Sequence, residues 1–181
     1  MTTMTRLDEL TGEYVVDPDR SKIGFIARHS MATRVHGYFG EFQGSAHLDG
    51  DEPSKSAARL TIVAKSLRTH DQRRDEHLRG KFLDTATHPV ITFASTKVEQ
   101  TAQATFTVTG DLALRGVTKP VSVDFELTGT ENDSRGELRV RFTGSVTINR
   151  RDWGVNWNAA TALLISEKVA LQFDVTAIRH P

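Results

Sequence analysis

The sequence has no cysteine among its 181 residues. Disulfides, thiol catalysis and cysteine-ligated metal sites are therefore excluded. It also lacks a surplus of either charge, because 23 Lys and Arg residues balance 23 Asp and Glu residues. Since proteins that bind nucleic acid usually carry a basic surplus, nucleic acid is not an expected partner.

Long hydrophobic runs are absent as well. No stretch approaches the roughly 20 apolar residues of a membrane-spanning helix, so no transmembrane segment is expected. The opening residues, MTTMTRLDEL, lack the apolar run of a signal peptide, and a cytoplasmic location is the expectation. Residues 1–11 are polar and are predicted to be a flexible tail that precedes one barrel domain over residues 12–181.

The familiar enzyme motifs are missing too. The chain contains no GxSxG, GxxxxGK[ST] or HExxH motif, and no GxGxxG followed by a helix. None of its seven histidines is spaced to set two metal ligands side by side on one strand or helix. The sequence therefore predicts no catalytic residues, no metal site and no cofactor, although a metal site assembled from distant strands stays open.

What the sequence does contain is alternation with a period of two, which predicts half-buried β-strands. Apolar residues hold every second position from Leu138 to Ile148, for example, with Arg, Thr and Ser between them. The same pattern runs through residues 23–29, 35–39, 58–64, 106–114, 121–127 and 169–175. Between Phe39 and Phe42 the apolar positions shift by one residue, which predicts a bulge at Gly40–Glu41.

One segment, Gln72–Arg79, predicts a helix. Thr69 and Gln72 resemble a capping box at its start, and Asp75 and Arg79 form an i,i+4 pair. This segment is rich in charge, and we expect it at the mouth of the fold.

Long antiparallel strands with one apolar face must close into a sandwich or a barrel. Glycines on the apolar faces leave room for curvature and favour the barrel. The predicted class is all-β, a single antiparallel eight-stranded lipocalin-like barrel with one short helix. Such a barrel is wide enough for one ligand, but periodicity alone does not decide whether side chains fill it.

Several segments, taken in order, resemble the YceI-like family of polyisoprenoid-binding proteins, from about residue 12 to residue 178. Any one of these segments would be a weak signal, whereas the ordered set is specific. The segments are Tyr14–Pro18 with Ser21, Phe25 and Arg28–His29; Gly37, Phe39, Phe42 and Gly44; Ser66–Thr69, Arg74–Asp75, His77–Arg79, Phe82–Asp84, His88–Pro89 and Phe93; Gly110–Leu112 and Arg115–Pro120; and Asn149–Arg150, Asp152–Val155 and Glu167–Val169.

This resemblance implies a lumen that holds a long isoprenoid lipid, such as a polyprenyl phosphate or a quinone tail, as a carrier or store and without catalysis. Many relatives carry a secretion signal, which is not seen here, and relatives are often dimers, so a homodimer is also open. His29, Arg74 and His77 would meet a polar head group at the mouth. The residues expected to contact the hydrocarbon chain are Phe25, Phe39, Phe42, Phe82, Phe93, Phe142 and Trp153, with Phe125 and Phe173 on the same inward faces.

Two alternatives stay open at this point. The protein could be an enzyme acting on a hydrophobic isoprenoid, with His29 and Asp75 as acid and base. It could also be a filled barrel that serves as a stress-response interaction module. Trp153 and Trp157 lie where the alternation breaks, and this segment fits a lid, a partner surface or a loop packed on the barrel.

Overall fold

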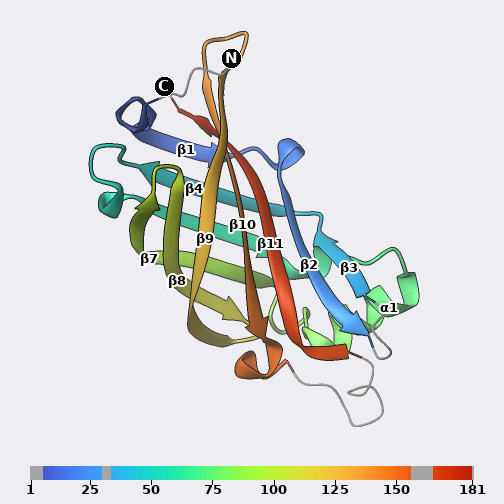
Figure 1. Ribbon diagram of the computed structural model, residues 1–181. Helices are drawn as coiled ribbons and strands as arrows, with labels where there is room; N and C mark the ends of the chain where they lie inside the picture. The colour runs from blue at the N-terminus through green and yellow to red at the C-terminus, as the bar shows by residue number, and fades with distance from the viewer. Residues whose placement is uncertain (1–5, 30–33, 156–164, 181) are drawn as a thin grey trace.

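The computed structural model describes residues 6–29, 34–155 and 165–180, and most of these residues belong to β-strands that form one barrel (Figure 1). The side chains of Arg28, His29 and Ile165 lie outside this description. In chain order the strands are β1 (Gly12–Val16), β2 (Lys22–His29), β3 (Arg34–Phe39), β4 (Phe42–Leu48), β5 (Ala57–Val63), β6 (Leu67–Arg68), β7 (Val90–Ala102), β8 (Thr105–Leu114), β9 (Val117–Asn132), β10 (Leu138–Asn149) and β11 (Ile165–Arg179).

The strands pair antiparallel, in the order β1-β4-β5-β7-β8-β9-β10-β11-β2-β3-β6. An additional pairing of β1 with β11, which aligns Tyr14 with Arg179, closes the ring. The closed ring has eight members, β1, β4, β5, β7, β8, β9, β10 and β11, while β2, β3 and β6 extend the wall beside the lower part of β11 (Figure 1). The predicted antiparallel eight-stranded barrel with one short helix is thus confirmed for the part of the chain that the structure describes.

Three long strands of the wall are interrupted at one level of the barrel. The turn η2 (Pro18–Arg20) separates β1 from β2, and η5 (Ala64–Ser66) separates β5 from β6. Gly40 and Glu41 separate β3 from β4. The predicted one-residue shift of the apolar positions is therefore at the expected place. It is a break between two strands, however, and not a bulge within one. The reason is that β3 pairs with β2 and β6, whereas β4 pairs with β1 and β5.

A buried serine provides hydrogen-bond partners for the backbone groups at this break. The Ser66 hydroxyl accepts a hydrogen bond from the Glu41 amide at 3.0 Å and donates to the Val63 carbonyl at 2.6 Å. The Gly40 amide donates to the Ser66 carbonyl at 3.0 Å. Buried backbone groups need such partners, so the wall bends here without leaving them unpaired.

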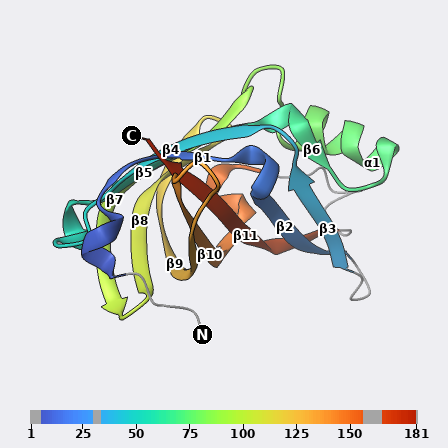
Figure 2. The same ribbon diagram turned by 90° about the horizontal axis from the view of Figure 1, so that it is seen from above.

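The helix α1 (Gln72–His77) lies outside the barrel beside β6 and continues into the π-helical turn η6 (Leu78–Phe82) (Figure 2). Asp71 caps it, because its carboxylate accepts a hydrogen bond from the Arg74 amide at 3.0 Å. Thr69 instead donates its amide and hydroxyl to the buried Asp75 carboxylate, at 2.8 and 2.5 Å. The predicted capping box of Thr69 and Gln72 is therefore wrong, whereas the Asp75–Arg79 pair is present at 3.9 Å.

Candidate ligand-binding lumen

The side chains that face inward leave the barrel partly empty. Two cavities, of about 180 Å³ and about 110 Å³, lie inside it. The larger, here called the upper cavity, is next to the turn η1 (Leu7–Leu10), and the smaller lower cavity is next to η6 and the turn η7 (Arg150–Trp153). Because successive side chains of a strand point to opposite faces, the alternation in the sequence gives both cavities almost wholly apolar walls.

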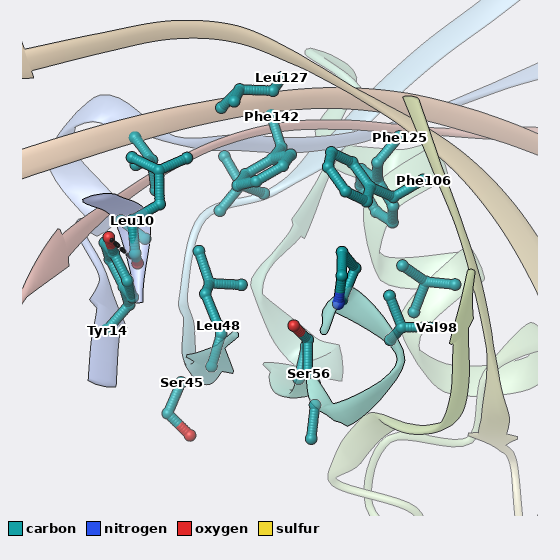
Figure 3. A pocket seen from close by; sticks show the side chains of 18 of the residues that line it. Leu10, Tyr14, Ser45, Leu48, Ser56, Val98, Phe106, Phe125, Leu127 and Phe142 are labelled. Atoms are coloured by element: carbon teal, nitrogen blue, oxygen red, sulfur yellow. Dashed lines mark hydrogen bonds between the residues drawn. The ribbon is translucent and has the colours of Figure 1, made fainter. Parts of the chain in front are cut away.

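The upper cavity is surrounded by aromatic and aliphatic side chains from both sides of the barrel (Figure 3). Its end is covered by η1, where Leu10 is only 3% exposed. The Tyr14 hydroxyl donates to the Leu10 carbonyl at 2.7 Å and so ties this turn to β1. Among the residues around the upper cavity are Leu7, Leu10, Tyr14, Ala46, Leu48, Val98, Phe106, Val108, Phe125, Leu127, Val140, Phe142 and Val175.

Tyr14 is the buried phenol of this cavity. Burial raises the pKa of its hydroxyl above the ordinary value of 10.0, although the nearby Arg179 partly lowers it. The hydroxyl therefore stays protonated at neutral pH and remains a hydrogen-bond donor.

The lower cavity carries a charged group, Arg150, which is 3% exposed. Its guanidinium donates to the Ser166 and Val155 carbonyls at 3.0 and 2.7 Å and lies 5.3 Å from the centre of the Phe82 ring. Burial lowers the pKa of Arg150, yet an arginine in a protein stays protonated. Among the residues around the lower cavity are Ile23, Phe25, Ala27, Val35, Phe39, Ile62, Leu67, Leu78, Phe82, Ile91, Leu112, Val121, Val146, Ile148 and Leu171.

Four residues line both cavities and so stand between them. They are Leu60 of β5, Phe93 of β7, Val123 of β9 and Phe173 of β11. We refer to these four as the partition. Leu60 and Phe93 are directly paired across β5 and β7.

Aromatic rings on the inner wall occupy the space beside glycines of neighbouring strands. A methyl group built on Gly110 would lie 2.5 Å from the Phe93 ring, and one on Gly144 would lie 2.7 Å from the Phe125 ring. Such separations are too short for real carbon atoms, so these glycines are what lets the rings lie where they do. The glycines on the apolar faces thus make room for rings as well as for curvature.

The structure brings most of the predicted aromatic residues to the cavities. Phe25, Phe39 and Phe82 line the lower cavity, Phe142 lines the upper one, and Phe93 lines both.

Two of the predicted aromatics lie elsewhere among the described residues. Phe42 packs against the core without appearing among the cavity-lining residues. Trp153 is 4% exposed, and its indole nitrogen donates to the Leu112 carbonyl at 2.9 Å, so it packs the lower end of the barrel.

The three polar residues predicted at the mouth have separate surroundings. Arg74 donates to the Thr69 hydroxyl and carbonyl, both at 2.8 Å, so its guanidinium holds the start of α1 in place. His77 is the half-buried last residue of α1. His29 ends β2, and its side chain lies outside the described residues, as does the whole of Trp157.

Sequence reasoning missed part of the upper cavity. Leu7 and Leu10 lie in the segment expected to be a tail, yet both line this cavity, together with Tyr14, Leu48 and Val98. The three-residue spacing of Leu7 and Leu10 in a polar stretch was the available signal, and it is too short to predict a buried turn.

The residues around the two cavities form an apolar container. No group of three His, Asp or Glu side chains among them is arranged to hold a metal ion. No helix in the described ranges is long and apolar enough to cross a membrane.

Comparisons with known sequences extend over nearly the whole chain. The family model of the YceI-like domain matches residues 14–177. A UPF0312 protein of Pseudomonas paraeruginosa is 35% identical over 174 residues, which cover 94% of this chain and 89% of that protein. A UPF0312 protein of Azotobacter vinelandii is 32% identical with the same coverage.

Solved structures share the barrel. BcnA of Burkholderia cenocepacia aligns with a TM-score of 0.81 at 21% identity, over 89% of this chain and 98% of that one. A YceI protein of Campylobacter jejuni has a TM-score of 0.76 at 26% identity, over 85% and 90% of the two chains. A polyisoprenoid binding domain from Saccharophagus degradans has a TM-score of 0.70 at 19% identity, over 92% and 98%. At 21% and 19% identity, BcnA and the Saccharophagus domain show the fold alone.

Proposed function

The chain belongs to the YceI-like domain family, and on that premise we propose that its barrel binds the hydrocarbon chain of an isoprenoid lipid as a carrier or store. The observation that carries this proposal is the pair of apolar cavities inside the barrel. A structural barrel of this size would instead fill its interior with side chains. The polyisoprenoid binding domain of Saccharophagus degradans, which shares the fold, supports the choice of ligand.

The walls suit a ligand made only of carbon and hydrogen. Each buried CH₂ group contributes roughly 0.8 kcal/mol through its removal from water, so a five-carbon isoprene unit could contribute at most about 4 kcal/mol. Ordering a flexible chain offsets part of this gain. Aromatic side chains such as Phe93, Phe106 and Phe142 offer large contact areas and have few bonds whose rotation must be frozen.

The polar head of such a lipid is proposed to lie at the lower end, near α1. His29, Arg74 and His77 remain the proposed contacts there, and Phe42 and Trp153 are proposed to support the apolar lining. A carrier must take up and release its ligand unchanged, which needs no nucleophile. Asp75, the carboxylate that an acid–base reaction would use, accepts two hydrogen bonds from Thr69 and is 7% exposed, which indicates a role in holding α1.

The direct test is organic extraction of the protein purified from its own host, followed by mass spectrometry and rebinding of prenols to the delipidated protein. We expect prenyl lipids in the extract and saturable rebinding. Extracts without isoprenoids, combined with delipidated protein that takes up no prenol, would contradict the proposal and favour the interaction-module alternative. Turnover of a bound isoprenoid would favour the enzyme alternative.

A matched pair of variants on β10 locates the binding. Val146 lines the lower cavity, whereas its neighbour Thr147 is exposed on the outer face. Val146→Trp should fill the cavity and weaken prenol binding at least tenfold, while Thr147→Trp should leave it unchanged. Circular dichroism shows whether both variants keep the barrel, and equal binding by the two would place the lipid outside the lumen.

A further inference from the structure

The two cavities and the residues between them point to a device that selects ligands by their length. We infer that the partition of Leu60, Phe93, Val123 and Phe173 is movable and sorts isoprenoid ligands by chain length. This inference rests on the proposed function. Short chains fit within one cavity, and longer chains enter the second cavity only after the partition opens.

Cavity size sets the length at which this sorting occurs. An engineered apolar cavity of about 150 Å³ holds one benzene molecule, which has six carbons. The upper cavity of about 180 Å³ and the lower one of about 110 Å³ bracket that size. Each therefore accommodates a fragment of about one isoprene unit, and a prenyl chain of two or more units requires both.

The partition consists of side chains, which can move more readily than the strands that bear them. Leu60, Phe93 and Phe173 are half-buried and line both cavities. The Phe173 ring lies 5.8 Å from the Phe125 ring in a tilted arrangement. Phe93 lies beside Gly110, where a side chain would block it. In this inference, rotamer changes at the two phenylalanines open the path between the cavities.

Gating predicts an effect on rates that simple lining does not. The association rate of a long prenol should be limited by opening of the partition, whereas that of a short prenol should not. Phe93→Ala removes one of the two phenylalanine rings of the partition. Phe106→Ala is its matched control, because Phe106 lines the upper cavity without lining the lower one.

The experiment measures association rates of the one-unit alcohol 3-methyl-2-buten-1-ol, geraniol, farnesol and geranylgeraniol by displacement of a fluorescent apolar probe. In the wild type we expect the rate to fall at least tenfold between the one-unit and two-unit prenols. Phe93→Ala should abolish that fall, and Phe106→Ala should preserve it. If both variants change all four rates by the same factor, the partition does not sort by length.

A substitution that strengthens the partition provides the opposite change. Val123→Phe should block prenols of two or more units and slow the one-unit alcohol much less. Since Val123 is 3% exposed and its variant could fail to fold, Leu60→Phe is the second variant for the same test. Long prenols that bind both variants as fast as the wild type would overturn the inference.

Xenon separates the failure of this inference from the failure of the proposed function. Crystals pressurised with xenon should show two separate sites in the wild type and one continuous site in Phe93→Ala. Continuous xenon density past Phe93 in the wild type would overturn the partition. Two separate xenon sites in a protein that binds no prenol would instead contradict the proposed function.

Discussion

At the scale of single residues, two serines hold together the places where the wall strands break. Ser66 serves the break between β3 and β4, as described above. Ser21 serves the break between β1 and β2, where its hydroxyl donates to the Asp17 carbonyl at 2.7 Å and accepts from the Thr176 amide at 2.9 Å. One hydroxyl thus replaces the strand-to-strand hydrogen bonds that are lost at each bend.

Replacement of Ser66 by alanine should therefore destabilise the barrel. The Glu41 amide would lose its acceptor in a partly buried setting, which costs roughly 0.5–1.5 kcal/mol of unfolding free energy. Urea unfolding of Ser66→Ala measures this loss, and Ser122→Ala on the exposed face of β9 is the control. An unchanged midpoint for Ser66→Ala would show that water or a shifted backbone takes over the role of the hydroxyl.

A bidentate ion pair on the outer wall makes the free energy of unfolding depend on pH in the acid range. Arg141 donates to both Asp174 oxygens, at 2.8 and 2.6 Å, and these hydrogen bonds lower the pKa of the Asp174 carboxyl. Since the carboxyl has its ordinary pKa of about 3.9 in the unfolded chain, the pair stabilises the fold above that pH. This stabilisation is lost as the pH falls from about 4 through the lower folded value.

Asp174→Asn should accordingly flatten the acid end of the stability profile. We expect the variant to be slightly less stable than the wild type at pH 7 and to approach it at pH 3. Denaturant midpoints at both values provide the measurement, and Asp111→Asn, which alters an exposed carboxylate of β8, is the control. Parallel profiles for Asp174→Asn and the wild type would mean that the pair has no net effect.

At the scale of elements, strand pairs of glycine and phenylalanine shape the inner wall. Gly144 and Phe125 are direct partners across β10 and β9, and a methyl group on Gly144 would also come within 2.8 Å of the Asp124 carbonyl. The glycine on one strand and the ring on the next are therefore one unit of packing, spread over two segments of sequence.

Gly144→Ala should disturb this unit. Overpacking of this kind costs typically about 1–3 kcal/mol, and the displaced Phe125 ring would also reduce the upper cavity. The control is Gly129→Ala on β9, where the nearest atom outside the neighbouring residues would be 4.0 Å away. Thermal unfolding and prenol binding of both variants test this. Similar results for the two would show that the strands shift to accommodate the methyl group without a loss of stability.

Sequence patterns predicted the elements better than their long-range contacts. Alternation reports which face of a strand is apolar, so Phe25, Phe39, Phe93 and Phe142 could be assigned to the interior. It does not report which inward side chains border a cavity, and Phe42 packs against the core without lining one. The short turn of Leu7 and Leu10 has no periodicity of its own.

Local helix signals had a similar limit. Thr69 fits a capping box by spacing, but its hydroxyl donates a hydrogen bond to the buried carboxylate of Asp75. Asp71 caps the helix instead. The hydrogen bond from Trp153 to the Leu112 carbonyl likewise joins residues 41 positions apart. Such contacts arise from the closed barrel, and no single segment contains them.

At the scale of the whole molecule, empty apolar space lowers stability and a ligand restores it. Atoms that line a void lose the dispersion contacts that a filled core provides. A lipid that binds only the folded barrel stabilises it by about 2.7 kcal/mol when its free concentration is 100 times the Kd. Delipidated protein should therefore melt at a lower temperature than loaded protein, and the difference should be smaller in Val146→Trp.

The barrel closes where β1 pairs with β11, strands that lie near the two ends of the sequence. β1 and β11 meet through three residue pairs, from Tyr14 opposite Arg179 to Val16 opposite Ala177. During synthesis β1 leaves the ribosome first and β11 last, so β1, β2 and β10 each keep an edge unpaired until β11 emerges. Unpaired edges beside an apolar face are prone to join other chains. The apolar face that lines the lumen in the folded protein is thus exposed until synthesis is nearly complete, and during that time it is a surface that a chaperone could protect.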